Sequence, residues 1–168
     1  CINLIGILFE NKVNDFNLIH AELPSLLSKV VTKNSLDQFI HVSALGIESA
    51  LDSKYALSKL EGEQKVRHNF SNATILKPSI VYSVDDNFTT NFMRLLGILP
   101  IMPLYYSGKT KFTPLHVSDF SNIIYDVIKK KIVGETIECI GPEVLTFKEI
   151  IIKILGSIKK KRLLFSLP

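Results

Sequence analysis

The residues of this chain with the clearest chemical potential are a serine, a tyrosine and a lysine in SALGIESALDSKYALSKLEGE, residues 43–63. Tyr55 precedes Lys59 by four residues, and side chains four apart lie on one face of a helix. A cation near a phenol favours the phenolate, which lowers the pKa of the tyrosine toward the range useful for proton transfer. Ser43, at the end of an expected strand, could hold a substrate carbonyl oxygen from the other side.

Two other tyrosines also precede a lysine by four residues, so spacing alone does not identify the pair. Tyr105 lies in PLYYSGKT, a loop with proline and glycine, where this spacing places nothing on a common face. Tyr125 follows a strand that ends on Ser118, but Ser118 is expected to be the N-cap of the next helix, with no loop between. Only the first pair follows a loop of about ten residues, long enough to cross the strand ends. We therefore predict that the first pair and Ser43 are the catalytic residues.

Strand-like and helix-like patterns alternate along the first half of the chain. Buried strands are expected at residues 1–6, 38–44 and 73–82, and amphipathic helices at 14–32 and 55–68. Pro24 is expected to kink the first of these helices. The alternation predicts an α/β fold: a Rossmann-like, doubly wound parallel sheet with right-handed crossovers and its three strands adjacent.

The second half continues with a mixture of strands and helices. Helices are expected at residues 87–96, 118–131 and 146–159, and strands at 111–117 and 135–140. The apolar run FMRLLGILPIMPLYY, broken by an arginine and two prolines, is expected to be a helix end and a buried loop, or alternatively an apolar lip for a lipid-like or quinone-like ligand. We predict one domain over residues 1–168, in which about 84–115 and 134–168 form a smaller substrate-side portion.

Composition excludes several classes of protein. The chain is 46% hydrophobic and 21% charged, which is typical of a globular domain rather than a disordered one. Its net charge of +4 arises from runs such as KKK and KKKR at expected helix ends, without the interleaved aromatic residues of a nucleic-acid groove. The histidines and two cysteines lack metal-ligand or disulfide-framework spacing, so no metal is expected. No run is suited to span a membrane, and a cytoplasmic location is expected, with peripheral association at the cytoplasmic face of the inner membrane as an option.

The serine, the YALSK motif and several other stretches resemble a known family. The stretches that carry the resemblance are NLIG, HVSALG, ATILKPSIVY, KFTPLHV, PLHVSDFSNII and GPEVLTFKEII, together with NLIGILFE. In these stretches the chain resembles the atypical and extended short-chain dehydrogenases/reductases, which are NAD-dependent epimerase/dehydratase-like proteins. Within that family the chain resembles bacterial relatives of the NADPH-binding accessory subunit of respiratory complex I, NADH:ubiquinone oxidoreductase. The resemblance spans nearly the whole chain and implies a Rossmann fold that binds NADP or NAD.

The resemblance also implies roles for individual residues. The adenosine side of the dinucleotide would be lined by Leu4, Ile5 and Gly6. Lys59 would bond the nicotinamide ribose hydroxyls, with Tyr55 beside it as proton donor and Ser43 nearby. The nicotinamide carboxamide would meet backbone groups of Pro78, Ser79 and Ile80.

Some features depart from the family pattern. The glycine-rich phosphate loop is absent, because the chain starts after the position where it would lie, and the preference between NAD and NADP therefore stays open. The chain has no initiator methionine and an apolar end, so we expect a piece of a longer protein, cut at both ends, with an exposed apolar face near residues 1–7. Where many relatives carry an asparagine, this chain has His20, which we expect to be a packed polar residue rather than part of a water relay.

Two functions from different classes remain open on the sequence. The first is a cofactor-binding subunit associated with complex I, whose dinucleotide stabilises the fold. The second is an active NAD(P)-dependent oxidoreductase or epimerase that acts on a carbonyl or nucleotide-sugar substrate through the serine, tyrosine and lysine. The resemblance favours the first function, and the intact serine, tyrosine and lysine favour the second.

Overall fold

The computed structural model describes residues 1–167 and shows an α/β protein with two compact units. The first unit contains residues 1–78 and 121–139, and the second contains residues 79–120 and the chain from 140 onward. Each unit has its own apolar core. Residues 134–139 had been assigned to the substrate-side portion, but they lie in the first unit because they supply a strand of its sheet.

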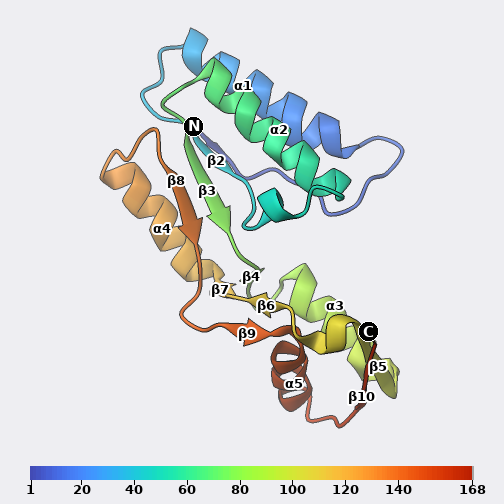
Figure 1. Cartoon of the computed structure of the whole chain (residues 1–168). Helices are drawn as coiled ribbons and strands as arrows, with labels where there is room; N and C mark the ends of the chain where they lie inside the picture. The colour runs from blue at the N-terminus through green and yellow to red at the C-terminus, as the bar shows by residue number, and fades with distance from the viewer. Residues whose placement is uncertain (168) are drawn as a thin grey trace. The chain divides into compact units, whose positions relative to one another are not determined.

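The first unit is built on a four-stranded parallel sheet (Figure 1). Its strands follow the order β1 (Ile2–Asn3), β2 (Ile40–Val42), β3 (Thr74–Pro78) and β8 (Thr136–Cys139). Ile40 is the registered partner of both Ile2 and Thr74, and Ile75 is the partner of Thr136. The prediction that the first three strands are adjacent and parallel is therefore confirmed, and their carboxyl ends lie at one edge of the sheet.

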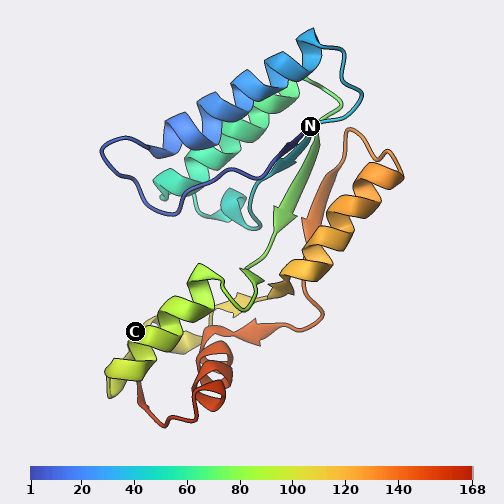
Figure 2. The same ribbon diagram turned by 180° about the vertical axis from the view of Figure 1, so that it is seen from behind.

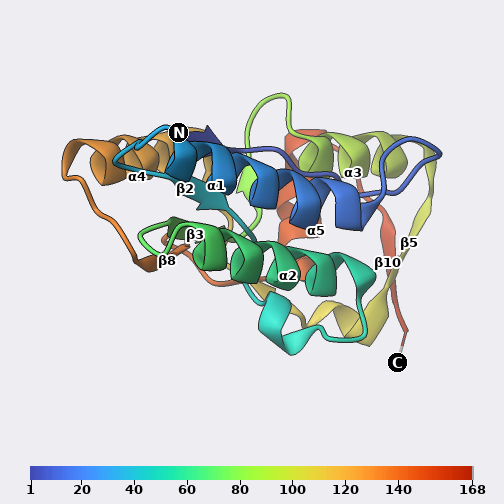
Figure 3. The same ribbon diagram turned by 90° about the horizontal axis from the view of Figure 1, so that it is seen from above.

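Helices cover both faces of this sheet. α1 (Leu23–Lys33) and α2 (Lys54–Asn69) lie side by side on one face, and α4 (Val117–Lys129) lies on the other (Figures 1, 2 and 3). Because the strands progress in one direction, the crossover from β3 to β8 has the opposite hand to the first two. The expectation of right-handed winding concerned only the crossovers between the first three strands. Between β3 and β8 the chain does not cross directly, but first forms residues 79–120 of the second unit.

The core of the first unit lies between the sheet and the helix pair. Its fully buried members come from α1, β2, α2 and β3, and they are Val31, Phe39, Val66, Ala73 and Ile75. Strand β1 lies at the edge of the sheet, where Leu4 and Ile5 that follow it are 62% and 51% exposed. The expected exposed apolar surface near residues 1–7 is therefore present.

Pro24 changes the hydrogen-bond register of the helix in which it lies. Proline has no N–H to donate to the carbonyl four residues earlier, and its ring crowds that carbonyl, which here belongs to His20. The preceding turn, Leu18–Glu22, is a π-helix in which Leu23 N donates to Leu18 O. The kink predicted at the proline thus takes the form of a π turn.

Gly62 allows α2 to pack closely against this π turn. A Cβ atom at Gly62 would lie 1.8 Å from the backbone oxygen of His20, a distance that no side-chain rotation can relieve. The contact therefore depends on a residue without a side chain. It brings α2, with its Tyr55 and Lys59, against the segment that follows β1.

A Gly62→Ala substitution should destabilise the protein. Alanine favours a helix by about 1 kcal/mol over glycine, but separating two packed backbones typically costs about 1–3 kcal/mol, so the net change should be a loss. The free energy of unfolding, measured in urea, should fall. Gly156→Ala in α5 (Phe147–Ser157) is the matched control, because a Cβ there meets no atom within 4 Å, and it should be neutral or stabilising. Equal stability of the two variants would contradict the close approach.

The second unit combines two helices with three pairs of short strands. Helix α3 spans Asn87–Ile98, and it packs against α5. The parallel pairs are β5 (Ile101–Leu104) with β10 (Leu163–Ser166) and β4 (Val81–Tyr82) with β7 (Leu115–His116), while β6 (Lys111–Phe112) and β9 (Leu145–Thr146) are antiparallel. The expectation of a buried loop after α3 was wrong for β5, because a partner strand 62 residues further along the chain (Leu163 opposite Ile101) supplies its hydrogen bonds.

The basic run at residues 159–162 caps a helix other than the one that precedes it. Arg162 Nε donates to Leu96 O at 2.8 Å, and Lys160 Nζ donates to Gly97 O at 2.7 Å. These carbonyls belong to the last turn of α3, where cations offset the negative end of the helix dipole. The expected helix-end role of these cations holds, but it serves α3 rather than α5.

Candidate functional site

Asn3 shapes the chain at the carboxyl edge of the sheet. The side chain of Asn3 is 1% exposed, and its Nδ2 lies 3.0 Å from Nδ1 of His41 on the neighbouring strand. Its Oδ1 accepts a hydrogen bond from Ile5 N at 3.1 Å. This bond turns the backbone directly after β1 and so positions Leu4, Ile5 and Gly6. Sequence reasoning had not selected Asn3, although a polar residue inside an apolar run was a signal for it.

Lys59 places a buried ammonium group at the same edge. The residue is 4% exposed, and its Nζ donates to Val42 O, at the end of β2, at 3.3 Å. A Cβ atom at Gly6 would lie 3.3 Å from this Nζ, so the glycine leaves room beside the cation. Burial lowers the pKa of Lys59 to about 8, although the negative charge of Glu63 acts in the opposite direction and raises it. Within residues 1–167, Lys59 has no carboxylate at ion-pair distance.

A second buried lysine pairs with the carboxylate that lies one helical turn after Lys59 on α2. Glu63 lies one helical turn after Lys59, but it pairs with Lys77 of β3 at 3.0 Å. Lys77, which is 8% exposed, also pairs with the exposed Glu48. Burial lowers the pKa of Lys77, but the hydrogen bonds to both glutamates outweigh it and raise the pKa overall. Lys77 thus keeps Glu63 engaged and leaves the Lys59 ammonium with unused donors. The sequence analysis had identified neither Lys77 nor Glu63.

Tyr55 lies one turn before Lys59 on α2 and is half-buried. Its ring makes edge contacts with His20, at 5.1 Å between centroids, and with Phe16, at 5.7 Å. Burial raises the pKa of Tyr55, because desolvation disfavours the phenolate. The expectation that the neighbouring cation lowers this pKa is therefore wrong for the protein alone, in which desolvation dominates.

His20 connects the segment after β1 with helix α2. Its Nε2 accepts a hydrogen bond from Ile7 N at 3.1 Å, and its Nδ1 lies 3.0 Å from Ser58 Oγ. Because Ser58 Oγ donates to Tyr55 O at 2.8 Å, Nδ1 of the neutral ring is the donor to this hydroxyl. Both ring nitrogens are thus paired within the protein. His20 is 1% exposed, which confirms the expectation of a packed polar residue.

Ser43 follows β2 with its hydroxyl buried. Its backbone N donates to Leu76 O at 2.8 Å, which fixes it beside β3. The residue is 4% exposed, and its Oγ has no hydrogen-bond partner among the described residues. A buried hydroxyl without a partner is costly, so this oxygen is suited to bind a ligand. The structure therefore places Ser43, Lys59 and Gly6 at the strand ends, with Tyr55 on the same helix as Lys59.

The other expected cofactor residues lie further along the chain. Pro78 ends β3 in the first unit, where its carbonyl accepts a hydrogen bond from Leu45 N at 3.0 Å. Ser79 and Ile80 belong to the second unit. Ser79 Oγ accepts a bond from Thr113 N at 3.3 Å, while Ile80 O accepts one from a backbone N–H at 2.8 Å.

The two alternative tyrosine–lysine pairs lie elsewhere. Tyr105 is 67% exposed and lies in the second unit. Tyr125 is 60% exposed on α4, where its ring contacts the ammonium of Lys129 at 5.7 Å. Ser118 lies in the first turn of α4 rather than before the helix, and its hydroxyl pairs with Nδ1 of His116 at 2.6 Å. Neither pair resembles the buried arrangement around Lys59.

Two buried histidines should make the protein acid-sensitive. Burial and the charge of Lys59 lower the pKa of His20 to about 4 and that of His41 to about 3. An unfolded chain protonates its histidines near pH 6.5, so below that pH the unfolded state binds more protons. The free energy of unfolding should fall by up to about 1.4 kcal/mol per pH unit for each histidine between about pH 6.5 and 4.

Urea unfolding at pH 7.5 and 5.5 measures this effect. His20→Gln should reduce the dependence on pH, whereas His68→Gln, which changes an exposed histidine, should keep it. Identical free energies of unfolding at both pH values would contradict the neutral, buried state of the two rings.

Comparison with known proteins finds similarity to two groups. It is 29% identical over 168 residues to the mouse (Mus musculus) mitochondrial protein NADH dehydrogenase (ubiquinone) 1 alpha subcomplex subunit 9. The aligned region covers 99% of this chain and 45% of the mouse protein. It is 26% identical over 118 residues to a ceramide reductase of Caulobacter vibrioides, with 70% of this chain and 37% of the reductase covered. The chain thus spans less than half the length of these curated relatives. No family model matches it.

Solved structures determine the fold class. A dTDP-4-dehydrorhamnose reductase from Clostridium acetobutylicum superimposes with a TM-score of 0.82 over 99% of this chain and 64% of its own, at 17% identity. The fold is the Rossmann-like fold of these reductases and epimerases. A UDP-glucuronic acid 4-epimerase from Bacillus cereus, solved with NAD, matches with a TM-score of 0.78 over 98% of this chain and 60% of its own, at 21% identity.

The chain is also similar to a subunit of NADH:ubiquinone oxidoreductase over nearly its whole length, as the recognised motifs had indicated. No helix in residues 1–167 is both long and apolar enough to cross a membrane.

Proposed function

We propose that this chain is part of an NAD(P)-binding, atypical short-chain dehydrogenase/reductase that associates with respiratory complex I. The observation that carries the proposal is the buried ammonium of Lys59, which has no carboxylate at ion-pair distance among residues 1–167. A buried charge without a partner is costly, and ribose hydroxyls would supply the missing acceptors. The similarity to complex I subunits supports the association.

The residues at the strand ends fit a dinucleotide. Gly6 has no side chain to obstruct the approach to Lys59 Nζ, and the Ser43 hydroxyl lacks a partner among the described residues. In this proposal Leu4, Ile5 and Gly6 line the adenosine side, and Lys59 donates to the nicotinamide ribose. Backbone groups of Pro78, Ser79 and Ile80 meet the carboxamide.

NADP or NAD, when bound, would supply hydride chemistry. The chain's own contribution would be to orient the nicotinamide end through Lys59 and to keep the Tyr55 phenol protonated, since burial raises its pKa. A protonated phenol can donate to a carbonyl oxygen as negative charge develops there. The Ser43 hydroxyl would donate a hydrogen bond to the same oxygen.

An active oxidoreductase or epimerase is the second candidate. It is favoured by the Ser43 hydroxyl, which lacks a partner among the described residues and can donate a hydrogen bond to a substrate carbonyl oxygen. One relative is described as a reductase, which agrees with this candidate. The substrate would contain a carbonyl group, as in nucleotide sugars or lipid ketones.

The location follows from the association. A subunit of this kind would associate peripherally with the membrane through its partner subunits. In a bacterial cell this position would be the cytoplasmic face of the inner membrane, and in a eukaryotic cell it would lie within mitochondria, as for the curated relatives.

Two measurements on the intact protein test the proposal. Titration with NADPH and NADH, followed by nicotinamide fluorescence, should show binding and raise the melting temperature through ligand linkage. Affinity-tagged protein, isolated from its own cells after mild detergent extraction, should carry complex I subunits. Binding without association would remove the subunit assignment, and the absence of any nicotinamide binding would overturn both candidates.

A further inference from the structure

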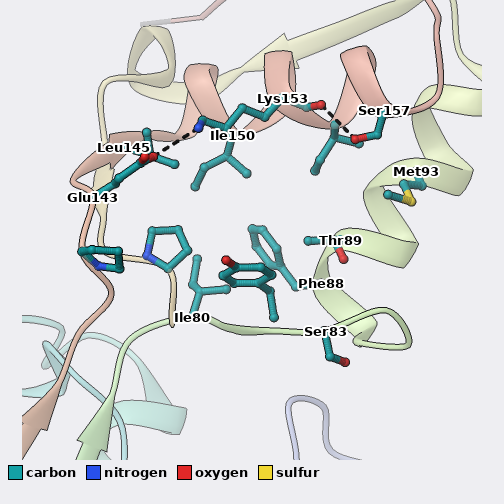
Figure 4. A pocket seen from close by; sticks show the side chains of 14 residues that line it. Ile80, Ser83, Phe88, Thr89, Met93, Glu143, Leu145, Ile150, Lys153 and Ser157 are labelled. Atoms are coloured by element: carbon teal, nitrogen blue, oxygen red, sulfur yellow. Dashed lines mark hydrogen bonds and ion pairs between the residues drawn. The ribbon is translucent and has the colours of Figure 1, made fainter. Parts of the chain in front are cut away.

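The second unit contains a cavity of about 450 Å³ (Figure 4). Every residue that lines it belongs to this unit. Its apolar wall comes from α3, α5 and the segments before them, and includes Ile80, Phe88, Met93, Leu145, Ile150 and Ile154. A cavity of this size with a largely apolar lining is typical of small-molecule sites.

The charged groups of the cavity cancel each other. Lys153 Nζ pairs with Glu143 Oε2 at 3.1 Å, and both side chains are more than 60% exposed. They therefore lie at the rim, where Figure 4 shows them on the same side of the cavity. The lining contains no other lysine or arginine. A nucleoside diphosphate carries charges that call for unpaired cations, so this cavity is poorly suited to such a ligand.

Two polar lining groups, Ser83 and Tyr82, retain free hydrogen-bonding capacity. Ser83 Oγ accepts a bond from Asp85 N at 3.3 Å, which leaves its own proton available. Thr89 Oγ1 donates to Asp86, and Ser157 Oγ donates to Lys153 O at 3.2 Å. The ring of Tyr82 contacts His116 at 5.2 Å between centroids, and the residue is 38% exposed. Within residues 1–167 the Tyr82 hydroxyl has no hydrogen bond to another residue. The phenol of Tyr82 can therefore bind one oxygen of a ligand.

We propose that this cavity binds an uncharged ligand with an apolar chain and one hydroxyl or carbonyl group, which pairs with Tyr82. The wall buries the chain, and burial contributes roughly 25 cal/mol for each Å² of apolar surface removed from water. The phenol selects the polar end. This inference does not rest on dinucleotide binding. Of the residues assigned to the dinucleotide only Ile80 lines the cavity, where its side chain forms part of the wall, whereas its backbone is what the proposed function assigns to the carboxamide.

Ligand-observed NMR on the intact protein tests the proposal, with 1-decanol as the probe and UDP-glucose as the charged competitor. Saturation transfer to decanol is expected, together with contacts between its chain and the Met93 methyl group. Met93→Glu places a charge in the wall and should weaken binding at least tenfold. Leu95→Glu adds the same charge to the same helix outside the lining and should leave decanol binding unchanged.

Tyr82→Phe separates the polar contact from packing. It should weaken decanol several-fold while leaving decane, which has no hydroxyl, unaffected. The proposal is overturned if decanol does not contact Met93 in the folded wild-type protein. That result is also expected if another segment of the intact protein fills the cavity. The proposal is also overturned if UDP-glucose displaces the probe. Failure of nicotinamide binding, by contrast, would leave these results unchanged and would count only against the proposed function.

Discussion

Replacing Tyr55 by phenylalanine should lower NAD(P)H-dependent carbonyl reduction by about two to four orders of magnitude, the usual contribution of a general acid. Dinucleotide affinity should hardly change, because the phenol acts on the substrate oxygen and Lys59 contacts the ribose. Tyr55 is half-buried, and its ring contacts with His20 and Phe16 survive in phenylalanine. The measurement pairs reduction rates on a panel of carbonyl substrates with fluorescence titration of NADPH.

Lys59→Met should have the opposite profile. A hydrogen bond to a charged group contributes about 1.5–3 kcal/mol, so affinity for the dinucleotide should fall roughly tenfold to a hundredfold. The protein without ligand should be at least as stable as the wild type, because a buried, unpaired ammonium has been removed. A lysine with a merely structural role would instead lose stability when replaced. Lys65→Met, which changes a more exposed lysine of the same helix, is the control for binding.

These two variants also separate the two candidate functions. If Tyr55→Phe abolishes a measurable reduction, a role as a binding subunit alone is excluded. If no substrate is turned over by the wild type while the protein isolates with complex I, the enzyme is excluded. Retention of full nicotinamide affinity in Lys59→Met would sink the site assignment for either function.

The positions of the three parallel strands could be predicted because each is a short apolar run whose neighbours in sequence are also its neighbours in space. The strand-end location of Ser43 followed from the same pattern. The pairing of β5 with β10 could not be predicted, because it depends on the path of the chain through the second unit. The opposite hand of the last crossover has the same origin.

The support around the candidate site was less accessible to sequence reasoning. Gly62 reads as an unfavourable helix residue until the carbonyl of His20 is placed against it. Asn3 and Lys77 are polar residues inside apolar strands, which is a signal that the sequence contains. Their partners could not be predicted, because these depend on the register of the strands and on which face of the sheet packs against α2. Periodicity identifies the element that carries a residue, whereas three-dimensional contacts decide what the side chain does.

Lys77→Met should weaken dinucleotide binding although Lys77 itself pairs with glutamates and not with the strand-end site. Without Lys77, the carboxylate of Glu63 loses its partner at 3.0 Å and turns to Lys59, one helical turn away. The new ion pair would raise the pKa of Lys59 and withdraw its ammonium from the ribose. We expect an affinity loss of roughly tenfold, together with reduced stability, because breaking a buried pair typically costs about 3–5 kcal/mol.

The double variant Lys77→Met/Glu63→Gln decides whether this diversion is the cause. With glutamine at position 63 no carboxylate competes for Lys59, so affinity for NADPH should return to within about threefold of wild type even if some stability remains lost. Glu48→Gln removes only the exposed partner of Lys77 and should change affinity little, because Glu63 stays engaged. Fluorescence titration and urea unfolding of the wild type, Lys77→Met, Glu63→Gln and the double variant complete the cycle. A double variant that binds as weakly as Lys77→Met would show that Lys77 supports the site through packing alone, and the diversion of Glu63 would have to be abandoned.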